Sequence, residues 1–173
     1  MDVREIDLER KPAYLRELNP RNRVPVIEHS GHVLTESEAL AEYVEEIVPE
    51  PRMMPADPAG RARVRSLMRR FEDLTDAYYA MRRGEPGAAS ELAAELEWVE
   101  DLLAAHPYLA GEEHTLADTG FWPWIVRVER VGGDLSAFPG IRSWAARLAE
   151  RDEYREELAV LDAVMPPRSP AAG

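Results

Sequence analysis

One short segment of this 173-residue chain is rich in proline, and regular secondary structure cannot continue through it. Pro49, Pro51 and Pro55 lie within seven residues. Because proline lacks a backbone N–H and fixes its own backbone, neither a helix interior nor a central strand runs through such a segment. The sequence therefore predicts a stiff connection here, with separate domains before and after it.

The two sides of this connection carry different patterns. Before it, residues 24–28 and 33–35 are β-rich runs around a loop that contains glycine, which predicts a hairpin. Residues 11–18 and 37–48 are typical of helices, and residues 2–8 suit an edge strand. After it, apolar residues recur at spacings of three and four, which predicts helices only. The expected order is an α/β domain over 1–49, a linker over 50–57, an all-α domain over 58–165 and a loose tail over 166–173.

Charge and composition exclude several functions. The 21 basic and 33 acidic side chains give a net charge of −12, which argues against direct nucleic-acid binding. The absence of cysteine excludes a cysteine nucleophile and thiolate metal ligands in this chain. His29 and His32 share one loop without a clear third ligand, so no metal site is expected. Without an apolar run near the roughly 20 residues of a membrane span, or a signal segment, we expect a cytoplasmic protein with no membrane association.

One constellation of residues points to a ligand. Pro25 opens the predicted hairpin, and a cis bond after Val24 would turn the Val24 backbone outward, where it pairs with an extended peptide. Glu36 and Ser37 end the hairpin and begin the next helix, whose free N–H groups suit a carboxylate. Glu36 suits an ammonium group, and the Ser37 hydroxyl is a further donor. The alternatives are an edge-strand proline, a helix cap and a surface charge.

These residues bear a family likeness. Residues 18–26, Leu-Asn-Pro-Arg-Asn-Arg-Val-Pro-Val, and residues 34–40, Leu-Thr-Glu-Ser-Glu-Ala-Leu, resemble the glutathione S-transferase family. Residues 108–118 resemble its capped core helix, and residues 138–144 resemble the start of its next helix. The likeness extends over nearly the whole chain, from residue 2 to about residue 164.

The resemblance implies a fold and a ligand. The fold is a thioredoxin-like α/β N-terminal domain with an all-α C-terminal domain, usually in a homodimer. Glutathione is then the co-substrate, held by the backbone of Val24 beside a cis Pro25, with Glu36 and Ser37 on its γ-glutamyl end. Arg23 stands where the family often has a basic residue near the glycyl carboxylate. The bound thiolate would attack a small electrophile.

The family's first strand, first helix and catalytic serine, tyrosine or cysteine would precede Asp2. A strand, a helix and two loops of typical length amount to roughly 25–30 residues that the family has before the position of Asp2. A start codon assigned too late, a truncated chain and a variant without the thiol-activating residue would each explain it, and the first is favoured. The catalytic residue therefore has no assignment. We expect the short form to bind glutathione poorly and to catalyse little.

A second group within the same fold gives an alternative. Residues 48–55, followed by Asp57 and Pro58, resemble the stringent starvation protein A group. That group usually has Pro-His-Pro where this chain has Pro49, Glu50 and Pro51. The resemblance implies a non-catalytic regulatory protein that associates with RNA polymerase.

Overall fold

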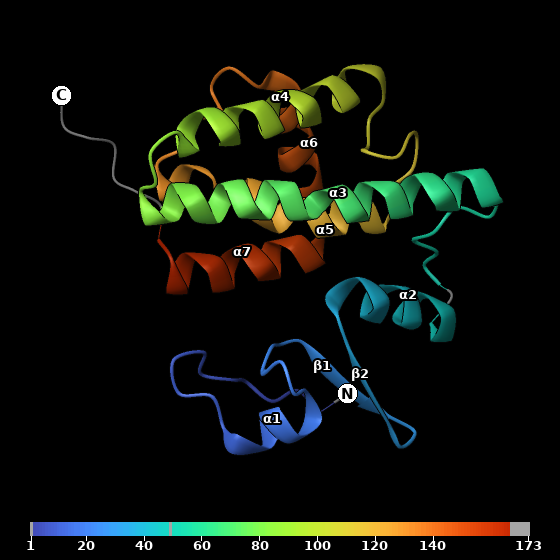
Figure 1. Cartoon of the computed structure of the whole chain (residues 1–173). Coiled ribbons are helices and arrows are strands. Elements are labelled where there is room, and N and C mark those ends of the chain that lie inside the picture. The colour runs from blue at the N-terminus through green and yellow to red at the C-terminus, as the bar shows by residue number, and fades with distance from the viewer. Residues whose placement is uncertain (1, 49, 167–173) are drawn as a thin grey trace. The chain divides into compact units, whose positions relative to one another are not determined.

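The computed structural model describes residues 2–48 and 50–166 and contains two compact units, Met1–Arg52 and Met53–Gly173. We call them unit 1 and unit 2 and describe each by itself. Figure 1 gives the order of their elements. Of the predicted tail over residues 166–173, only Pro166 is among the described residues, and Pro49 of the proline segment also lies outside them.

Unit 1 is a hairpin with two helices. The predicted hairpin is confirmed: the two strands pair antiparallel, with Val26 opposite Thr35 and His29 opposite His32. Ser30 and Gly31 connect them with positive φ angles of 51° and 79°, which a two-residue hairpin turn with the native strand twist requires. The elements are α1 (Ala13–Leu18), β1 (Val26–His29), β2 (His32–Thr35) and α2 (Ser37–Ile47).

Two expectations for unit 1 need correction. Residues 2–8 form no strand, so the predicted edge strand is wrong. The apolar residues Val3, Ile6 and Leu8 suggest a strand, but a strand also needs a hydrogen-bonded neighbour. Among the described residues, β1 pairs only with β2. The first helix is also shorter than predicted, because it starts at Ala13 with Pro12 as its N-cap.

Unit 2 is all helical, as the apolar spacing predicts. Helix α3 begins after Asp57, whose carboxylate accepts the Gly60 N–H at 2.8 Å, and Pro58 lies in its first turn. It ends at Gly84, whose left-handed backbone closes the helix. The elements are α3 (Pro58–Arg83), α4 (Ala88–Ala105), α5 (Leu116–Ile125), the 3₁₀ turn η1 (Glu129–Val131), α6 (Pro139–Ala149) and α7 (Asp152–Val164).

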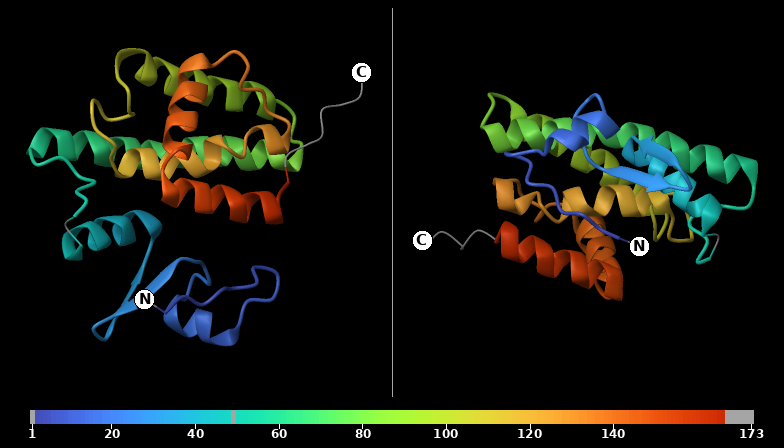
Figure 2. Two further views of the ribbon diagram at one scale, coloured as in Figure 1. Left: turned by 180° about the vertical axis from the view of Figure 1, so that it is seen from behind. Right: turned by 90° about the horizontal axis from the view of Figure 1, so that it is seen from below.

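The helices of unit 2 form two layers around one core. Helices α3 and α4 run antiparallel in front, with α5 and α6 behind them, and the reverse view shows α6 in front (Figures 1 and 2). The core is rich in aromatic side chains. Its largest fully buried members include Tyr78, Phe121, Trp122 and Trp144.

A buried carboxylate ties the core together. Asp118 is fully buried and accepts hydrogen bonds from the Thr115 N–H at 2.9 Å, the Leu109 N–H at 3.0 Å and the Trp144 indole N–H at 2.8 Å. Thr115 and Asp118 form a capping box, in agreement with the resemblance of residues 108–118 to a capped helix. The bond to Trp144 adds a link from α5 to α6 that the local motif does not reveal. Asp118 is therefore a structural residue, because its carboxylate oxygens accept hydrogen bonds from groups of the core.

A second polar cluster joins α7 to this framework. The Tyr154 hydroxyl lies 2.6 Å from His114 Nε2 and 3.2 Å from Thr119 Oγ1. Burial raises the pKa of Tyr154 to about 12, so its hydroxyl stays protonated at neutral pH. Burial also lowers the pKa of His114, and Arg151 lowers it further, while Asp118 and Glu153 act in the opposite direction.

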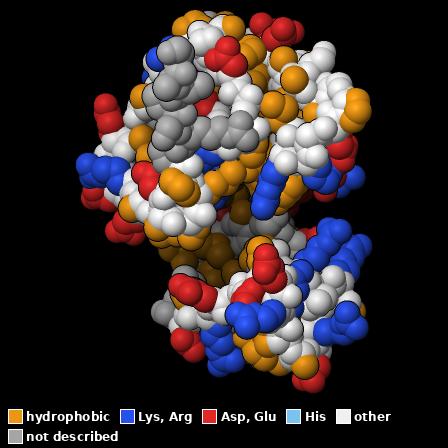
Figure 3. Space-filling model, turned by 90° about the vertical axis from the view of Figure 1, so that its left-hand side faces the viewer, with side chains coloured by type: hydrophobic (Ala, Val, Ile, Leu, Met, Phe, Trp, Pro, Cys, Tyr) orange, Lys and Arg blue, Asp and Glu red, His pale blue; other side chains and the backbone are white. Residues whose placement is uncertain are grey.

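The molecular surface is mixed. Figure 3 shows a face on which basic, acidic and apolar side chains are interspersed. None of the helices described over residues 2–48 and 50–166 is long and apolar enough to cross a membrane.

Candidate functional site

The hairpin register brings the predicted ligand residues to one end of unit 1. Val26 pairs with Thr35 at the end of the hairpin, and Pro25 directly precedes this pair on one strand while Glu36 directly follows it on the other. Ser37 comes next as the first residue of α2. Two segments eleven residues apart in the sequence therefore meet at the open end of the hairpin, away from its Ser30–Gly31 turn.

The Val24–Pro25 peptide bond is cis, as the sequence analysis favours. Val24 is 41% exposed, and it precedes the first paired residue of β1, so the hairpin leaves its backbone unpaired. An exposed backbone segment beside a strand is a place where an extended peptide adds main-chain hydrogen bonds.

A buried asparagine holds the turn that leads into this segment. Asn19 is only 4% exposed; its side chain donates to the Arg23 carbonyl at 3.0 Å and accepts the Arg21 N–H at 3.0 Å. Asn22 has a φ of 54°, a left-handed conformation that asparagine tolerates better than most residues. Lys11 donates to the Asn22 carbonyl at 2.9 Å. The approach to Val24 is thus fixed from both sides.

Glu36 has an unusual backbone. Its φ of 69° and ψ of 111° lie in a region that costs a non-glycine residue of order 1–3 kcal/mol. It occupies the N-cap position of α2, yet its side chain makes no capping hydrogen bond. Strain of this kind persists where the surroundings impose it, and it is concentrated at ligand sites. The strain and the free cap position both favour a role for Glu36 beyond ending a strand.

Arg21 contacts Glu36, a predicted ligand residue, and the sequence did not predict this contact. Its guanidinium lies 3.1 Å from Glu36 Oε1, and both side chains are more than half exposed. The two residues are fifteen positions apart, and the only signal in the sequence was a basic residue in the turn before the hairpin. An ammonium group that approaches Glu36 therefore meets a carboxylate that already has one cationic partner.

The structure gives less support for the predicted roles of the other two residues, Ser37 and Arg23. Ser37 is exposed at the start of an eleven-residue helix, where the first N–H groups are free to face a carboxylate. Arg23 is exposed next to Val24, and its carbonyl accepts from Asn19. Among the described residues, no hydrogen bond of the Arg23 side chain is found, so nothing directs it toward Glu36 or Ser37.

The two histidines of the hairpin do not form a metal centre with their neighbours. His29 Nδ1 lies 2.5 Å from the Tyr43 hydroxyl, which ties the hairpin to α2. Within residues 2–48 and 50–166, no group of three or more His, Asp or Glu side chains is arranged to hold a metal ion.

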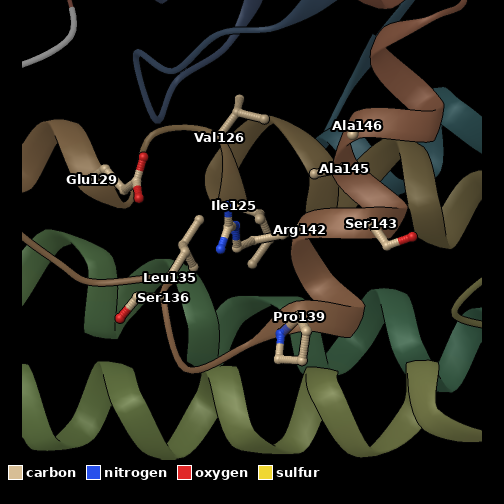
Figure 4. Close-up of a pocket in the computed structure, with 10 residues that line it drawn as sticks. All are labelled: Ile125, Val126, Glu129, Leu135, Ser136, Pro139, Arg142, Ser143, Ala145 and Ala146. Atoms are coloured by element: carbon tan, nitrogen blue, oxygen red, sulfur yellow. The ribbon is translucent and has the colours of Figure 1, made fainter.

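Unit 2 has a surface pocket of its own with a volume of about 760 Å³. Figure 4 shows it between the end of α5 and one side of α6, with Arg142 directed into the space near Leu135. It contains none of the residues predicted to bind glutathione. Its lining also includes Ile125, Val126, Glu129, Ser136, Pro139 and Ser143.

Comparison with known families decides the classification. The family model described as "Glutathione S-transferase, N-terminal domain" matches residues 1–52, and the model "Glutathione S-transferase, C-terminal domain" matches residues 58–147. The chain belongs to the glutathione S-transferase family. The resemblance and the fold class stated from the sequence are therefore confirmed.

Two relatives of this glutathione S-transferase family member illustrate different kinds of protein. A stringent starvation protein A homolog of Pasteurella multocida is 34% identical over 155 residues, with 84% of this chain and 72% of the relative covered. Glutathione S-transferase omega-1 of Rattus norvegicus is 30% identical over 159 residues, which cover 86% of this chain and 66% of the rat protein. Sequence similarity thus links the chain both to a transferase and to a starvation protein.

A solved structure agrees with the fold. The glutathione transferase homolog from Sulfitobacter, crystallised with bound glutathione, superposes with a TM-score of 0.73 at 28% identity, covering 90% of this chain and 80% of that one. The glutathione in that structure belongs to the Sulfitobacter protein.

Proposed function

We propose that this chain binds glutathione at the open end of the unit 1 hairpin and uses it with a small electrophile. The observation that carries the proposal is the register pair Val26–Thr35, which brings a cis-proline segment and the start of α2 to one place. The family membership supports the same ligand. Glutathione is a short peptide with an ammonium group and two carboxylates, so it needs a backbone partner, an anion and a cation or free N–H groups.

Each residue has a role in this proposal. The Val24 backbone hydrogen-bonds the cysteinyl backbone of glutathione, with cis Pro25 fixing its direction. Ser37 and the first N–H groups of α2 receive the γ-glutamyl carboxylate. Glu36 binds the γ-glutamyl ammonium group through one oxygen while Arg21 keeps the other, since a carboxylate accepts at both oxygens. Arg23 is the candidate for the glycyl carboxylate.

The reaction proposed is conjugation. The glutathione thiolate forms a bond from sulfur to an electrophilic carbon, and the electron pair of the broken bond departs with the leaving group. The residue that holds the thiol as thiolate is not assigned. The residues named here bind and orient glutathione, and they do not by themselves lower the pKa of its thiol.

Titration calorimetry with glutathione tests the binding step. We expect weak but saturable binding, and a Ser37→Ala variant with affinity lower by about tenfold, which is the contribution of one hydrogen bond to a charged group. Ser66→Ala, at an exposed serine of α3, is the matched control and leaves binding unchanged. Equal affinities of the Ser37→Ala variant and the unaltered chain would count against the site.

The alternative is a non-catalytic regulatory protein of the stringent starvation protein A type, supported by the 34% identity to the Pasteurella multocida homolog. Co-purification with RNA polymerase, without retention on immobilised glutathione, favours this alternative. Retention on glutathione together with conjugation of an aromatic electrophile favours the transferase. We also expect a homodimer in either case, since the family usually forms one.

A further inference from the structure

The surface pocket of unit 2 combines a buried apolar lining with charged side chains. Ile125 at the end of α5 and Leu135 in the loop before α6 both line it and are buried. Its volume of about 760 Å³ lies within the range of roughly 300–1,000 Å³ that is usual for small-ligand sites. The residues that line it are not those of the proposed glutathione site, so that proposal does not explain the pocket.

Arg142 in this pocket differs from the arginines around it. For its side chain, no hydrogen bond or ion pair is found among the described residues, and Figure 4 shows the guanidinium directed into the space. Arg142 is also the fourth residue of α6, near a helix N-terminus, where a basic side chain is unfavourable. The other arginines of residues 126–156 all donate to a carboxylate or a backbone carbonyl: Arg127, Arg130, Arg147, Arg151 and Arg155.

Glu129 supplies the opposite charge at the same pocket. It is the first residue of η1 and is exposed, and its carboxylate lies at the edge of the space (Figure 4). Within the described parts of the chain, no ion pair of the Glu129 side chain is found, so it does not pair with Arg142. The pocket therefore has an anion and a cation that lie apart and that can each bind a charged group of a ligand.

Two serines line the pocket, and they differ in what their hydroxyl groups do. Ser136 Oγ donates to Asp134 at 2.8 Å, so its proton is used within its own loop. Ser143 directly follows Arg142 on α6 and is exposed, and its side chain makes no hydrogen bond to any other described residue. A guanidinium and a hydroxyl next to each other suit a carboxylate, because a carboxylate accepts hydrogen bonds at both oxygens.

We propose that the α5–α6 pocket binds a dipeptide of apolar residues with both of its termini free. Its carboxylate is bound by the Arg142 guanidinium and the Ser143 hydroxyl, and its ammonium group pairs with Glu129. Its apolar side chains lie against Ile125 and Leu135, where they are removed from water. The inference goes beyond the proposed function, because it concerns a second ligand and other residues.

A dipeptide suits these residues better than other carboxylates do. In a single amino acid the ammonium group and the carboxylate share one carbon, whereas a dipeptide separates them by a peptide unit, which suits the separate positions of Glu129 and Arg142. An apolar acid without an ammonium group leaves Glu129 without a partner. Glutathione has a second carboxylate, which Glu129 repels, and no large apolar side chain to lie against the buried lining.

Blocked dipeptides test the need for both charges. Titration calorimetry of the full chain with L-leucyl-L-leucine should show saturable binding. N-acetyl-L-leucyl-L-leucine lacks the ammonium group and L-leucyl-L-leucinamide lacks the carboxylate, so each should bind at least about tenfold more weakly through the loss of one charged hydrogen bond. Equal affinities of the free and the acetylated dipeptide would overturn the proposal, and so would the absence of saturable binding of the free dipeptide.

Two substitutions assign each terminus of the dipeptide to a residue. Arg142→Gln should abolish the difference in affinity between the free dipeptide and its amide, and Glu129→Gln should abolish the difference between the free dipeptide and its acetylated form. Arg63→Gln on α3 and Glu156→Gln on α7 are matched controls that should leave all three affinities unchanged. All four positions are exposed, so circular dichroism should show the helical signal of the unaltered chain. Unchanged affinities in the Arg142→Gln and Glu129→Gln variants would overturn the proposal.

Discussion

The two units differ in what holds them together and in what they offer to a ligand. In the described part of unit 1, the buried side chains are Leu15, Asn19 and Leu40, whereas unit 2 buries a large set with Trp122 and Trp144 at its centre. Unit 2 is therefore stabilised by its own packing. Unit 1 presents exposed backbone, a strained glutamate and the start of a helix. Substitutions in unit 2 should act on stability, and those at the hairpin end of unit 1 should act on ligand binding.

The largest effect is expected where the core of unit 2 depends on one carboxylate. Asp118→Ala would leave the Thr115 and Leu109 N–H groups and the Trp144 indole N–H buried without an acceptor. We expect a loss of about 3–5 kcal/mol in the free energy of unfolding, measured by chemical denaturation. Asp134→Ala, at an exposed loop residue, is the control and should cost far less. Similar losses for both would contradict the role of the Asp118 network.

The matching substitution in unit 1 is Glu36→Gln, which keeps size and removes charge. We expect glutathione affinity to fall by 10- to 100-fold, about 1.4–2.7 kcal/mol, since an ion pair with the ammonium group is lost. The unfolding free energy should change little, because the side chain is more than half exposed. Glu28→Gln on β1 serves as the control. A large loss of unfolding free energy with unchanged glutathione affinity would contradict the expectation that substitutions at the hairpin end of unit 1 act on ligand binding.

A smaller effect concerns acidification of unit 2. Because burial lowers the pKa of His114, the unfolded chain binds more protons than the folded one around and below the ordinary value of 6.5. Stability is therefore present above pH 6.5 and declines as the pH falls through that range. Thermal unfolding between pH 7.5 and pH 5 should show a shallower decline in His114→Gln than in the unaltered chain. Parallel pH dependences would contradict the assignment to His114.

The smallest effect separates the two partners of Glu36. Arg21→Ala should raise glutathione affinity about two- to fivefold at low salt, since a cation near the ammonium group is removed from an exposed pair. The gain should vanish at high salt, where exposed charges are screened. An affinity loss that persists at high salt would show instead that Arg21 positions the Glu36 carboxylate.

The sequence was sufficient for features set by neighbouring residues. The hairpin and the cap at the start of α5 follow from residue types a few positions apart, and the cis Pro25 is what the family resemblance implies. Contacts between distant residues were not predictable. The pairing of Arg21 with Glu36 and the bond from Trp144 to Asp118 depend on how separate elements pack. Residues 2–8 failed as a strand because their pattern does not specify a partner.

The most direct test of the central claim is a glutathione titration followed by NMR of the backbone amides. The account predicts that the largest saturable shifts fall on Val24, Glu36 and Ser37, with smaller ones in the turn around Asn22. The amides that surround the α5–α6 pocket should stay unchanged. Shifts centred instead on the α5–α6 pocket around Arg142, or no saturable shift at all, would contradict it.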